Sequence, residues 1–373
     1  MTGLQNQFLK GRKLTMDVLK PELMWIEGIC YRINSIDPIF SGTAEDDEYD
    51  EEDNYQDESC ALDEPCDEFE LEVTEGGRYR TTFHVARSYF PFIIGAKGAT
   101  RRRLENETRT QIRVPRQGQD GNIIITGSDK KGVSAARRRI NLIVISARQK
   151  QPFTHFLSIP MTGESIKEGF LKFKEEVLEK CKDRSIDSSI FQSPDKLHLT
   201  IGTLVLSDEE ERKKAAKVLM ECKETVIDPI LEHQPLTLRM VGVEYMNDDP
   251  AEVDVLYGKI ELKSSGLILQ TLSDGIVDFF ANSGLMEKQY EQVKLHVTLM
   301  NTLFREDKGG VSEHETSKRR HKPRESFDAT NVLKMFENFN FGEQQVDNIH
   351  LSQRYTTSNT DGYYKASATI SLT

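Results

Sequence analysis

The sequence predicts an α+β protein of at least two domains, and two observations lead to this prediction. A five-residue frame occurs twice, at 196–200 and 294–298, and each copy lies in an alternating apolar run that is typical of a strand. Charge is also strongly segregated along the chain, which at 373 residues is too long for one average domain. Helical spacing between the alternating runs predicts a mixed fold.

The repeated frame reads Lys-Leu-His-Leu-Thr and Lys-Leu-His-Val-Thr. Residues i and i+2 of a strand share a face, so His198 lies beside Thr200 and His296 beside Thr298. One such motif is most simply an ordinary strand with a half-buried histidine, but two matching copies favour a function. Two imidazoles and two hydroxyls in one cleft suit acid–base work on a phosphate ester. We place the lysines of both frames on the aliphatic side and assign them no chemistry.

The two frames belong to a region, 151–373, in which strands and helices alternate. Each frame follows a helix, about a hundred residues apart, which indicates an internal duplication. We expect two lobes whose antiparallel sheets face a central cleft. The expected strands are 153–159, 236–243 and 253–262, the expected helices are 166–180, 209–222, 267–283 and one after 326–328, and a hairpin is expected to turn at Asp361-Gly362.

Charge segregation divides the rest of the chain. Residues 45–72 contain 16 Asp and Glu and no Lys or Arg, whereas 78–150 contain 17 Lys and Arg against 4 Asp and Glu. A basic module able to meet polyanions therefore stands beside an acidic stretch. The expected organisation is an N-terminal segment (1–44), an acidic linker (45–75), a basic nucleic-acid-binding domain (76–150) and the duplicated domain (151–373).

Three segments carry open alternatives. The patch around Trp25 in 1–44 is too small to fold alone and either packs on a domain or docks on a partner. The acidic linker is expected to be disordered, either as a plain linker or as a nucleic-acid mimic. The basic run 318–324 fits a nuclear import signal, a phosphate-contacting loop or a solvated loop.

Composition limits the compartment and the chemistry. The five cysteines are odd in number, widely spread and without zinc-ligand spacing, so we expect free thiols in the cytosol or nucleus. No secretory signal or membrane-spanning run is evident. No carboxylate cluster suggests a metal, and we expect neither a metal nor another cofactor.

The basic module is predicted to have the order β-α-α-β-β-α. Gly95-Ala96-Lys97-Gly98 joins its first two helices, and two glycines there let the backbone approach phosphates while the following helix adds positive dipole. This motif, with Thr108, Ile112 and Val114-Pro115 downstream, resembles the KH family in its eukaryotic type I form. The resemblance implies that the loop clamps single-stranded nucleic acid. Arg101 stands where the family usually has an aliphatic residue, so either the helix is rotated or an arginine stem covers the core. With Arg102 it favours general phosphate attraction.

The paired His-x-Thr strands resemble the 2H phosphoesterase family, and Phe153–Leu157 resembles the opening strand of its A-kinase-anchor-like branch. The resemblance implies metal-free cleavage of a phosphodiester on RNA or a nucleotide. It implies that His198 and His296 are general base and general acid, and that Thr200 and Thr298 bind the non-bridging oxygens. The residues alone do not say which histidine is the base. The remaining histidines lack a paired frame and are expected to be structural or on the surface.

The combination of KH and 2H domains, with the segments 245–250 and 301–305, is similar to a family of accessory subunits of cointegrator complexes. This resemblance implies a nuclear protein that works with a helicase subunit in transcription coactivation and alkylation-damage repair. The alternative is a non-catalytic scaffold that holds RNA or nucleotide ends through the KH loop and the 2H cleft.

Overall fold

The computed structural model describes part of the chain, in two units, Met1–Pro65 and Cys66–Thr373. The described residues are 69–116, 119, 121–232, 234–246, 248–261, 267–305 and 324–372, with the backbone alone for 22–26, 29–33 and 264–266. In the first unit, β1 (Glu22–Ile26) pairs antiparallel with β2 (Ile29–Ile33). The acidic stretch 45–67 and nearly all of the basic run 318–324 lie outside the described residues.

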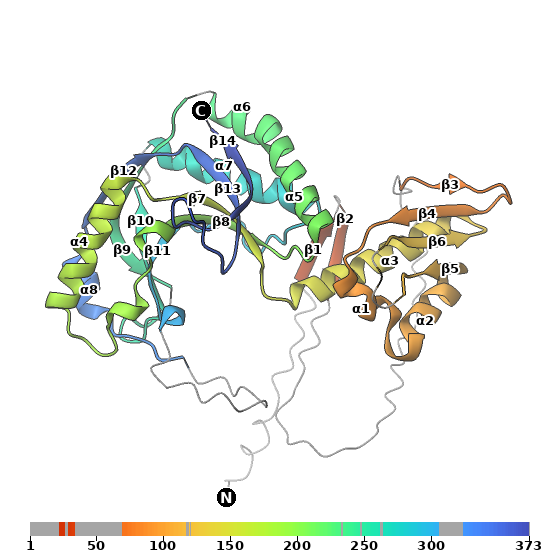
Figure 1. The fold of residues 1–373 in the computed structure, drawn as a ribbon, viewed down its shortest axis with the longest axis horizontal. Coiled ribbons are helices and arrows are strands. Elements are labelled where there is room, and N and C mark those ends of the chain that lie inside the picture. Colours follow the sequence, from red (N-terminus) through yellow and green to blue (C-terminus); the bar gives the residue numbers. More distant parts are fainter. Residues whose placement is uncertain are drawn as a thin grey trace, which may run out of the picture. The chain divides into compact units, whose positions relative to one another are not determined.

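Residues 69–149 form a small α+β module around a four-stranded antiparallel sheet of order β3-β4-β6-β5 (Figure 1). Its strands are β3 (Glu72–Val73), β4 (Tyr79–Phe83), β5 (Thr110–Arg113) and β6 (Ile123–Gly127), and its helices are α1 (Phe90–Ile94), α2 (Ala99–Thr108) and α3 (Lys130–Gln149). From β4 onward the predicted order is confirmed. The sequence does not predict β3, because two residues are too few to show a period.

The core of this module follows the two periodicities of its sequence. Strand β6 alternates, burying Ile123 and Ile125. Helix α3 buries one face at three- and four-residue spacing, including Ile140, and Asp129 caps it by accepting from the Gly132 N–H at 3.1 Å.

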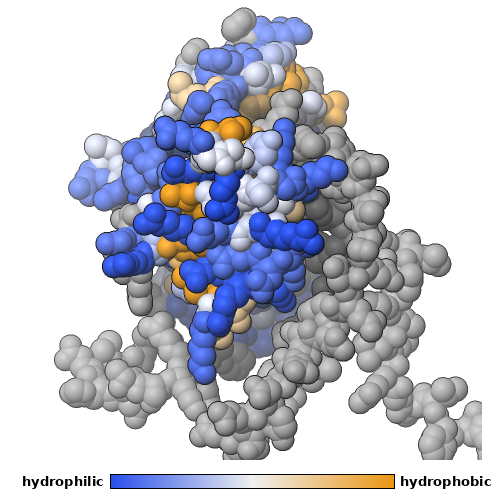
Figure 2. All heavy atoms as spheres, turned by 90° about the vertical axis from the view of Figure 1, so that its right-hand side faces the viewer, coloured by the Kyte–Doolittle hydropathy of each residue, from blue (hydrophilic) through white to orange (hydrophobic). Residues whose placement is uncertain are grey.

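Figure 2 shows that the visible described surface is mostly hydrophilic, with hydrophobic residues in small separate patches.

Residues 155–371 contain an eight-stranded sheet of order β12-β9-β10-β11-β8-β7-β13-β14. Its strands are β7 (His155–Pro160), β8 (His198–Leu204), β9 (Thr237–Tyr245), β10 (Val255–Ile260), β11 (His296–Asn301), β12 (Asn340–Gln345), β13 (Asn348–Gln353) and β14 (Ala366–Ser371). All neighbouring strands are antiparallel.

The two halves of this sheet meet between β8 and β11, where a single register pair, Leu199 with Val297, joins them. We call this pairing the seam. The chain just before β8 extends it, since the Gln192 N–H donates to the Leu299 carbonyl at 2.9 Å and Phe191 forms a bridge with Met300. The seam places the two repeated frames on adjacent strands.

Helices cover the sheet and bury its aliphatic residues. They are α4 (Glu164–Lys180), α5 (Glu209–Cys222), a π-helical turn (Lys223–Ile227), α6 (Asp228–Leu231), α7 (Ser264–Asn282) and α8 (Thr330–Met335). Helix α4 packs on β12, α5 on β14 and α7 on β8 and β9 (Figure 1). One continuous core results, in which the aromatic rings of Phe173, Phe336 and Phe341 are buried together.

The structure refines three expectations for this domain. The predicted lobes are present as two four-stranded halves, but the seam makes them parts of one sheet. Strand β12 is absent from the sequence prediction. Its sequence, Asn-Phe-Gly-Glu-Gln-Gln, has one large apolar residue, Phe341, and so shows no alternating apolar pattern. Asp361-Gly362 lies in a long connection between β13 and β14, which do pair, rather than at a tight hairpin turn.

The KH-like module and the sheet domain share a junction at the end of α3 and the start of α5. The Arg148 guanidinium pairs with Glu211, with side-chain exposures of 15% and 9%, and donates to the Gly284 carbonyl at 3.2 Å. Glu211 also accepts from the Ser207 N–H at 2.7 Å. His84 contacts Asp208 at 2.8 Å. Because the central ion pair is largely removed from water, breaking it leaves an uncompensated charge.

We predict that Glu211→Gln lowers the free energy of unfolding by about 2–3 kcal/mol, because Arg148 loses its carboxylate while the amide still accepts from Ser207. Thermal and denaturant unfolding measure this. The matched control is Glu210→Gln on the same helix, whose partner Lys213 is exposed. Equal effects of the two changes would show that the junction pair is no stronger than a surface pair.

Candidate active site

The candidate site is built on the two strands of the seam. His198 and Thr200 of β8 and His296 and Thr298 of β11 are half-buried, while the residues between them are fully buried in the core. The alternation of the sequence therefore holds at both frames. The four polar side chains share the face of the sheet opposite the aliphatic ones.

The seam register decides how these side chains meet. Continuing the Leu199–Val297 pair by one residue each way aligns His198 with Thr298 and Thr200 with His296. Side chains directly opposite on antiparallel strands lie roughly 5 Å apart at Cβ. Each histidine thus faces the threonine of the other frame, and the charge on His296 acts on His198. The structure brings all four predicted residues together.

The same backbone contact orients both imidazoles. Nδ1 of His198 lies 2.7 Å from the Lys196 carbonyl oxygen, and Nδ1 of His296 lies 2.6 Å from that of Lys294. A carbonyl oxygen only accepts, so each Nδ1 carries a proton and donates. In the neutral ring Nε2 is then the free base. Both frames thus offer the same nitrogen for proton exchange.

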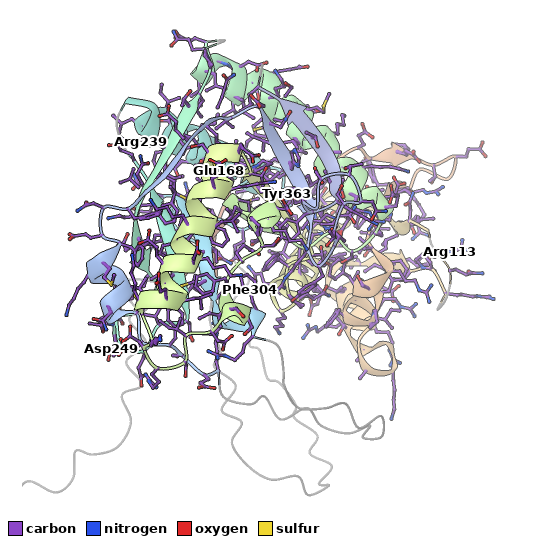
Figure 3. All side chains as sticks on the ribbon, turned by 60° about the vertical axis from the view of Figure 1, so that its left-hand side comes forward. Arg113, Glu168, Arg239, Asp249, Phe304 and Tyr363 are labelled. Atoms are coloured by element: carbon purple, nitrogen blue, oxygen red, sulfur yellow. The ribbon has the colours of Figure 1, made fainter. Side chains whose placement is uncertain are left out.

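Aromatic rings enclose His198. The centroids of Phe156, Tyr364 and Tyr363 lie 5.0, 5.4 and 6.4 Å from its own. Tyr363, labelled in Figure 3, and Tyr364 come from the connection between β13 and β14. Burial lowers the pKa of His198 to about 4, with a smaller lowering from His296 that opposes the Lys196 hydrogen bond. His198 is therefore neutral at physiological pH.

His296 has a more open and more charged setting. One ring contacts it, that of Tyr257 on β10 at 5.4 Å, and Tyr257 is the register partner of Thr298. Burial lowers the pKa of His296, the Lys294 hydrogen bond raises it, and the positive charge of Lys294 lowers it further. The two halves of the site therefore differ in what surrounds each imidazole.

The placement of the two lysines was wrong. Lys196 ends a 3-10 turn just before β8 and Lys294 lies just before β11, so neither lysine belongs to the aliphatic face of a strand. Its ammonium lies 5.1 Å from the ring centroid of Tyr364, and that of Lys294 lies 4.9 Å from that of Tyr257. Each lysine thus contacts the tyrosine that also contacts the histidine of its frame.

The aromatic residues of the site were missed from the sequence. Tyr364 contacts the rings of Phe156 and Tyr363 at 5.0 and 5.2 Å, and the buried Gln192 hydrogen-bonds its hydroxyl. Tyr363 donates to Ser158 at 3.0 Å. Of these aromatic residues, only Phe156 lies in a segment that the sequence singles out, the expected opening strand 153–159. The tyrosines lie far along the chain in no repeated frame.

Three other described histidines lie outside the paired frames. His155 is buried, with Nδ1 2.9 Å from the Thr154 hydroxyl, and burial lowers its pKa to about 4. His350 is half-buried with its ring 5.5 Å from Tyr363, and His84 contacts Asp208. Each of the three is thus packed against or bonded to a neighbour outside the seam, although Nε2 of His155 and Nδ1 of His350 are buried without a hydrogen bond among the described residues.

The loop between α1 and α2 depends on its glycines. Gly95 has φ 71° and ψ 178°, a region open essentially to glycine, and a Cβ there would lie 2.2 Å from the Thr100 hydroxyl. Gly98 is left-handed with φ 80°. Ala96 and Lys97 between them are exposed. The loop therefore presents backbone and one ammonium group to solvent at the start of α2.

The arginines after the loop have partners within the module. Arg102 donates to the carbonyls of Lys97 at 2.8 Å and Gly98 at 3.4 Å, so it braces the loop. The Arg101 guanidinium lies 3.8 Å from Glu105, with Nε shielded from solvent. This placement agrees with an arginine stem that covers the core beside Leu104. Arg113 on β5, labelled in Figure 3, is exposed.

Within the described residues, no group of three or more His, Cys, Asp or Glu side chains is arranged to hold a metal ion. A helix long and apolar enough to cross a membrane is also absent from this part of the chain.

Comparison with known families agrees with this architecture. A model described as AKAP7 2′5′ RNA ligase-like domain matches residues 153–372, and one described as KH domain matches 80–142. The first match covers more than half of the chain. This chain belongs to the AKAP7 2′5′ RNA ligase-like family. The family membership confirms the 2H-like fold that the paired frames predict, and the second match confirms the KH domain.

The chain is also similar to activating signal cointegrator 1 complex subunit 1 of Mus musculus. The two are 44% identical over 353 residues, which is 93% of this chain and 98% of the mouse protein. Among solved structures, the first KH type I domain of human vigilin is 29% identical, with a TM-score of 0.19, and the match covers 20% of this chain and 80% of that one. The match to the mouse protein confirms the resemblance to cointegrator-complex subunits.

We predict that His198 of the native protein protonates near pH 4, well below the ordinary value of 6.5. NMR titration of its ring protons measures this. Tyr364→Ala should move the midpoint upward, because water then reaches the imidazolium. Tyr355→Ala, in the same connection but 84% exposed, is the control.

The same shift has a consequence for stability. Between pH 6.5 and about 4 the unfolded chain binds a proton that the folded one does not, so stability falls as pH falls through this window. A native midpoint near 6.5 that Tyr364→Ala leaves unchanged would contradict the enclosure of His198.

Proposed function

We propose that this chain binds nucleic acid through its KH domain and cleaves phosphodiesters of RNA or nucleotides with the paired histidines. The observation that carries the proposal is the seam, which aligns two imidazoles of equal orientation with two hydroxyls on one face. A pair of imidazoles can take a proton at one side of a phosphate and give one at the other. Neither step requires a metal ion.

The different settings of the two imidazoles support a division of roles between them. His198, enclosed by rings, is neutral and takes the proton of the attacking 2′-hydroxyl or water through Nε2 as the new P–O bond forms. His296, more open to solvent, acts in its protonated imidazolium form and gives its Nε2 proton to the leaving oxygen as the old P–O bond breaks, which leaves the neutral ring with its proton on Nδ1. Thr200 and Thr298 donate hydrogen bonds to the non-bridging oxygens, where negative charge grows.

The KH domain supplies the nucleic-acid contact in this proposal. The loop 95–98 offers exposed backbone to phosphates at the N-terminus of the ten-residue helix α2. Phe92, one turn before the loop on α1, is 48% exposed and available to a base. Arg102 stabilises the loop by donating a hydrogen bond to the Lys97 carbonyl, and the backbone of the loop contacts the phosphates.

We also propose that the chain works in the nucleus as a subunit of a helicase-containing cointegrator complex, in transcription coactivation and alkylation-damage repair. The support is the mouse relative, whose name describes it as a subunit of a cointegrator complex. A scaffold that holds RNA or nucleotide ends without turnover remains the alternative.

We expect His198→Ala and His296→Ala each to lower turnover of short oligonucleotides or 2′,3′-cyclic phosphates by at least about a hundredfold, in the presence of a chelator. Product analysis by chromatography measures this, and circular dichroism checks the fold. His84→Gln is the control, because this histidine lies at the junction. Retained activity in either alanine variant would refute the two-histidine mechanism, and tight binding without wild-type turnover would favour the scaffold.

We expect Lys97→Asp to weaken binding of single-stranded RNA and to reduce its salt dependence, because a phosphate contact is lost and a repulsive charge gained. Fluorescence anisotropy over a range of salt concentrations measures both. Lys131→Asp makes the same charge change at the start of α3, near the opposite end of α2. Equal losses in both variants would show attraction by net charge and not by the loop.

A further inference from the structure

The lysine of each repeated frame is part of a recurring arrangement. The Lys196 ammonium lies over Tyr364 and the Lys294 ammonium over Tyr257, at 5.1 and 4.9 Å from the ring centroids. Each tyrosine ring lies 5.4 Å from the histidine of the same frame. A lysine, a tyrosine and a histidine thus recur on both sides of the seam, although the tyrosines come from unrelated segments.

The two lysines differ in what else they contact. Lys196 is half-buried, donating to the Thr357 hydroxyl at 2.8 Å and the Thr356 carbonyl at 3.3 Å. Lys294 is exposed, and the described residues give its ammonium no hydrogen bond or ion pair besides the Tyr257 ring. Its charge acts on His296. One ammonium is thus held by the protein, and the other is open to a ligand.

The aromatic rings gather around His198, whereas the open ammonium of Lys294 lies on the side of His296. Among the described residues, three aromatic rings surround His198, whereas one contacts His296. Rings next to a reacting centre suit a base or sugar, and an open ammonium suits a phosphate. The face of the seam that carries the four polar residues therefore has an aromatic end around His198 and a cationic end at Lys294.

Resting on the proposed function, we propose that Lys294 binds a second phosphate of the substrate, the one that follows the scissile group on the leaving side. The substrate class is then an oligonucleotide whose leaving nucleotide carries its own 3′-phosphate, rather than a cyclic mononucleotide or a bare dinucleotide. Lys294 precedes His296 by two residues, and its ammonium lies over Tyr257, whose ring also contacts His296.

Binding of that phosphate also affects the proton donor. Lys294 disfavours the imidazolium of His296 electrostatically. An anion on Lys294 cancels this effect, so the donor form of His296 becomes more populated when the second phosphate is present. The other titratable groups near His296 are His198, Tyr257 with Glu244 beside it, and Lys259, which is the register partner of His296 on β10.

The test compares a dinucleotide with the same dinucleotide carrying a 3′-phosphate. Wild-type kcat/KM should be about tenfold or more higher for the phosphorylated form, since a charged hydrogen bond is gained. Lys294→Gln should remove the preference and Lys294→Arg should keep it. Lys196→Gln is the matched control and should leave the ratio between the two substrates unchanged. An unchanged ratio in Lys294→Gln, or no wild-type preference, would overturn the proposal.

Affinity separates this proposal from the proposed function. In the His198→Ala background, the dissociation constants of the two dinucleotides are measured by calorimetry at several salt concentrations. Tighter binding of the phosphorylated form that depends on Lys294 supports the second-phosphate site even if the wild type turns over neither. Equal affinities with normal wild-type turnover would reject the site and leave the two-histidine mechanism standing.

Discussion

The pairing of Leu199 with Val297 is the constraint on which the site depends. Each half of the sheet has four strands, but only one of the two frame histidines lies in each half, His198 on β8 and His296 on β11. Because side chains alternate with a period of two, a slip of one residue at the seam would turn the histidine and threonine of the shifted strand into the core, away from those of the other strand. The aliphatic residues around the pair prevent this slip, since they are fully buried. Packing on one face of the sheet thus fixes the chemistry on the other.

The equal frames acquire unequal surroundings from the rest of the fold. Nothing within either frame distinguishes His198 from His296, and their carbonyl contacts match within 0.1 Å. The difference comes from the connection between β13 and β14, which lays Tyr363 and Tyr364 against one histidine and not the other. A duplicated unit therefore becomes asymmetric through a segment outside the duplication. That asymmetry separates a proton acceptor from a proton donor.

Short-range sequence patterns predicted the features that depend on neighbouring residues alone. The alternation around 197–201 and 295–299 was enough to place four side chains on one face, and the glycines at 95 and 98 were enough to locate the KH loop. The sequence could not show that the halves join into one sheet, because strand pairing between distant segments leaves no short-range period. It could not find Tyr257, Tyr363 and Tyr364, which reach the site only through tertiary contacts. Both lysines lie just before their strands, so the alternation of the frames does not place them, and only tertiary contacts bring them to Tyr364 and Tyr257.

The contacts that orient the two imidazoles are made by main-chain carbonyls rather than side chains. Substitution of Lys196 or Lys294 changes charge at the cleft but leaves these acceptors in place, since every residue has a carbonyl oxygen. The tautomer of each histidine therefore does not depend on which side chain occupies position 196 or 294. During divergence, relatives built on this sheet can exchange the lysines and tyrosines around the cleft, and with them the range of substrates, while the nitrogen that exchanges protons stays the same.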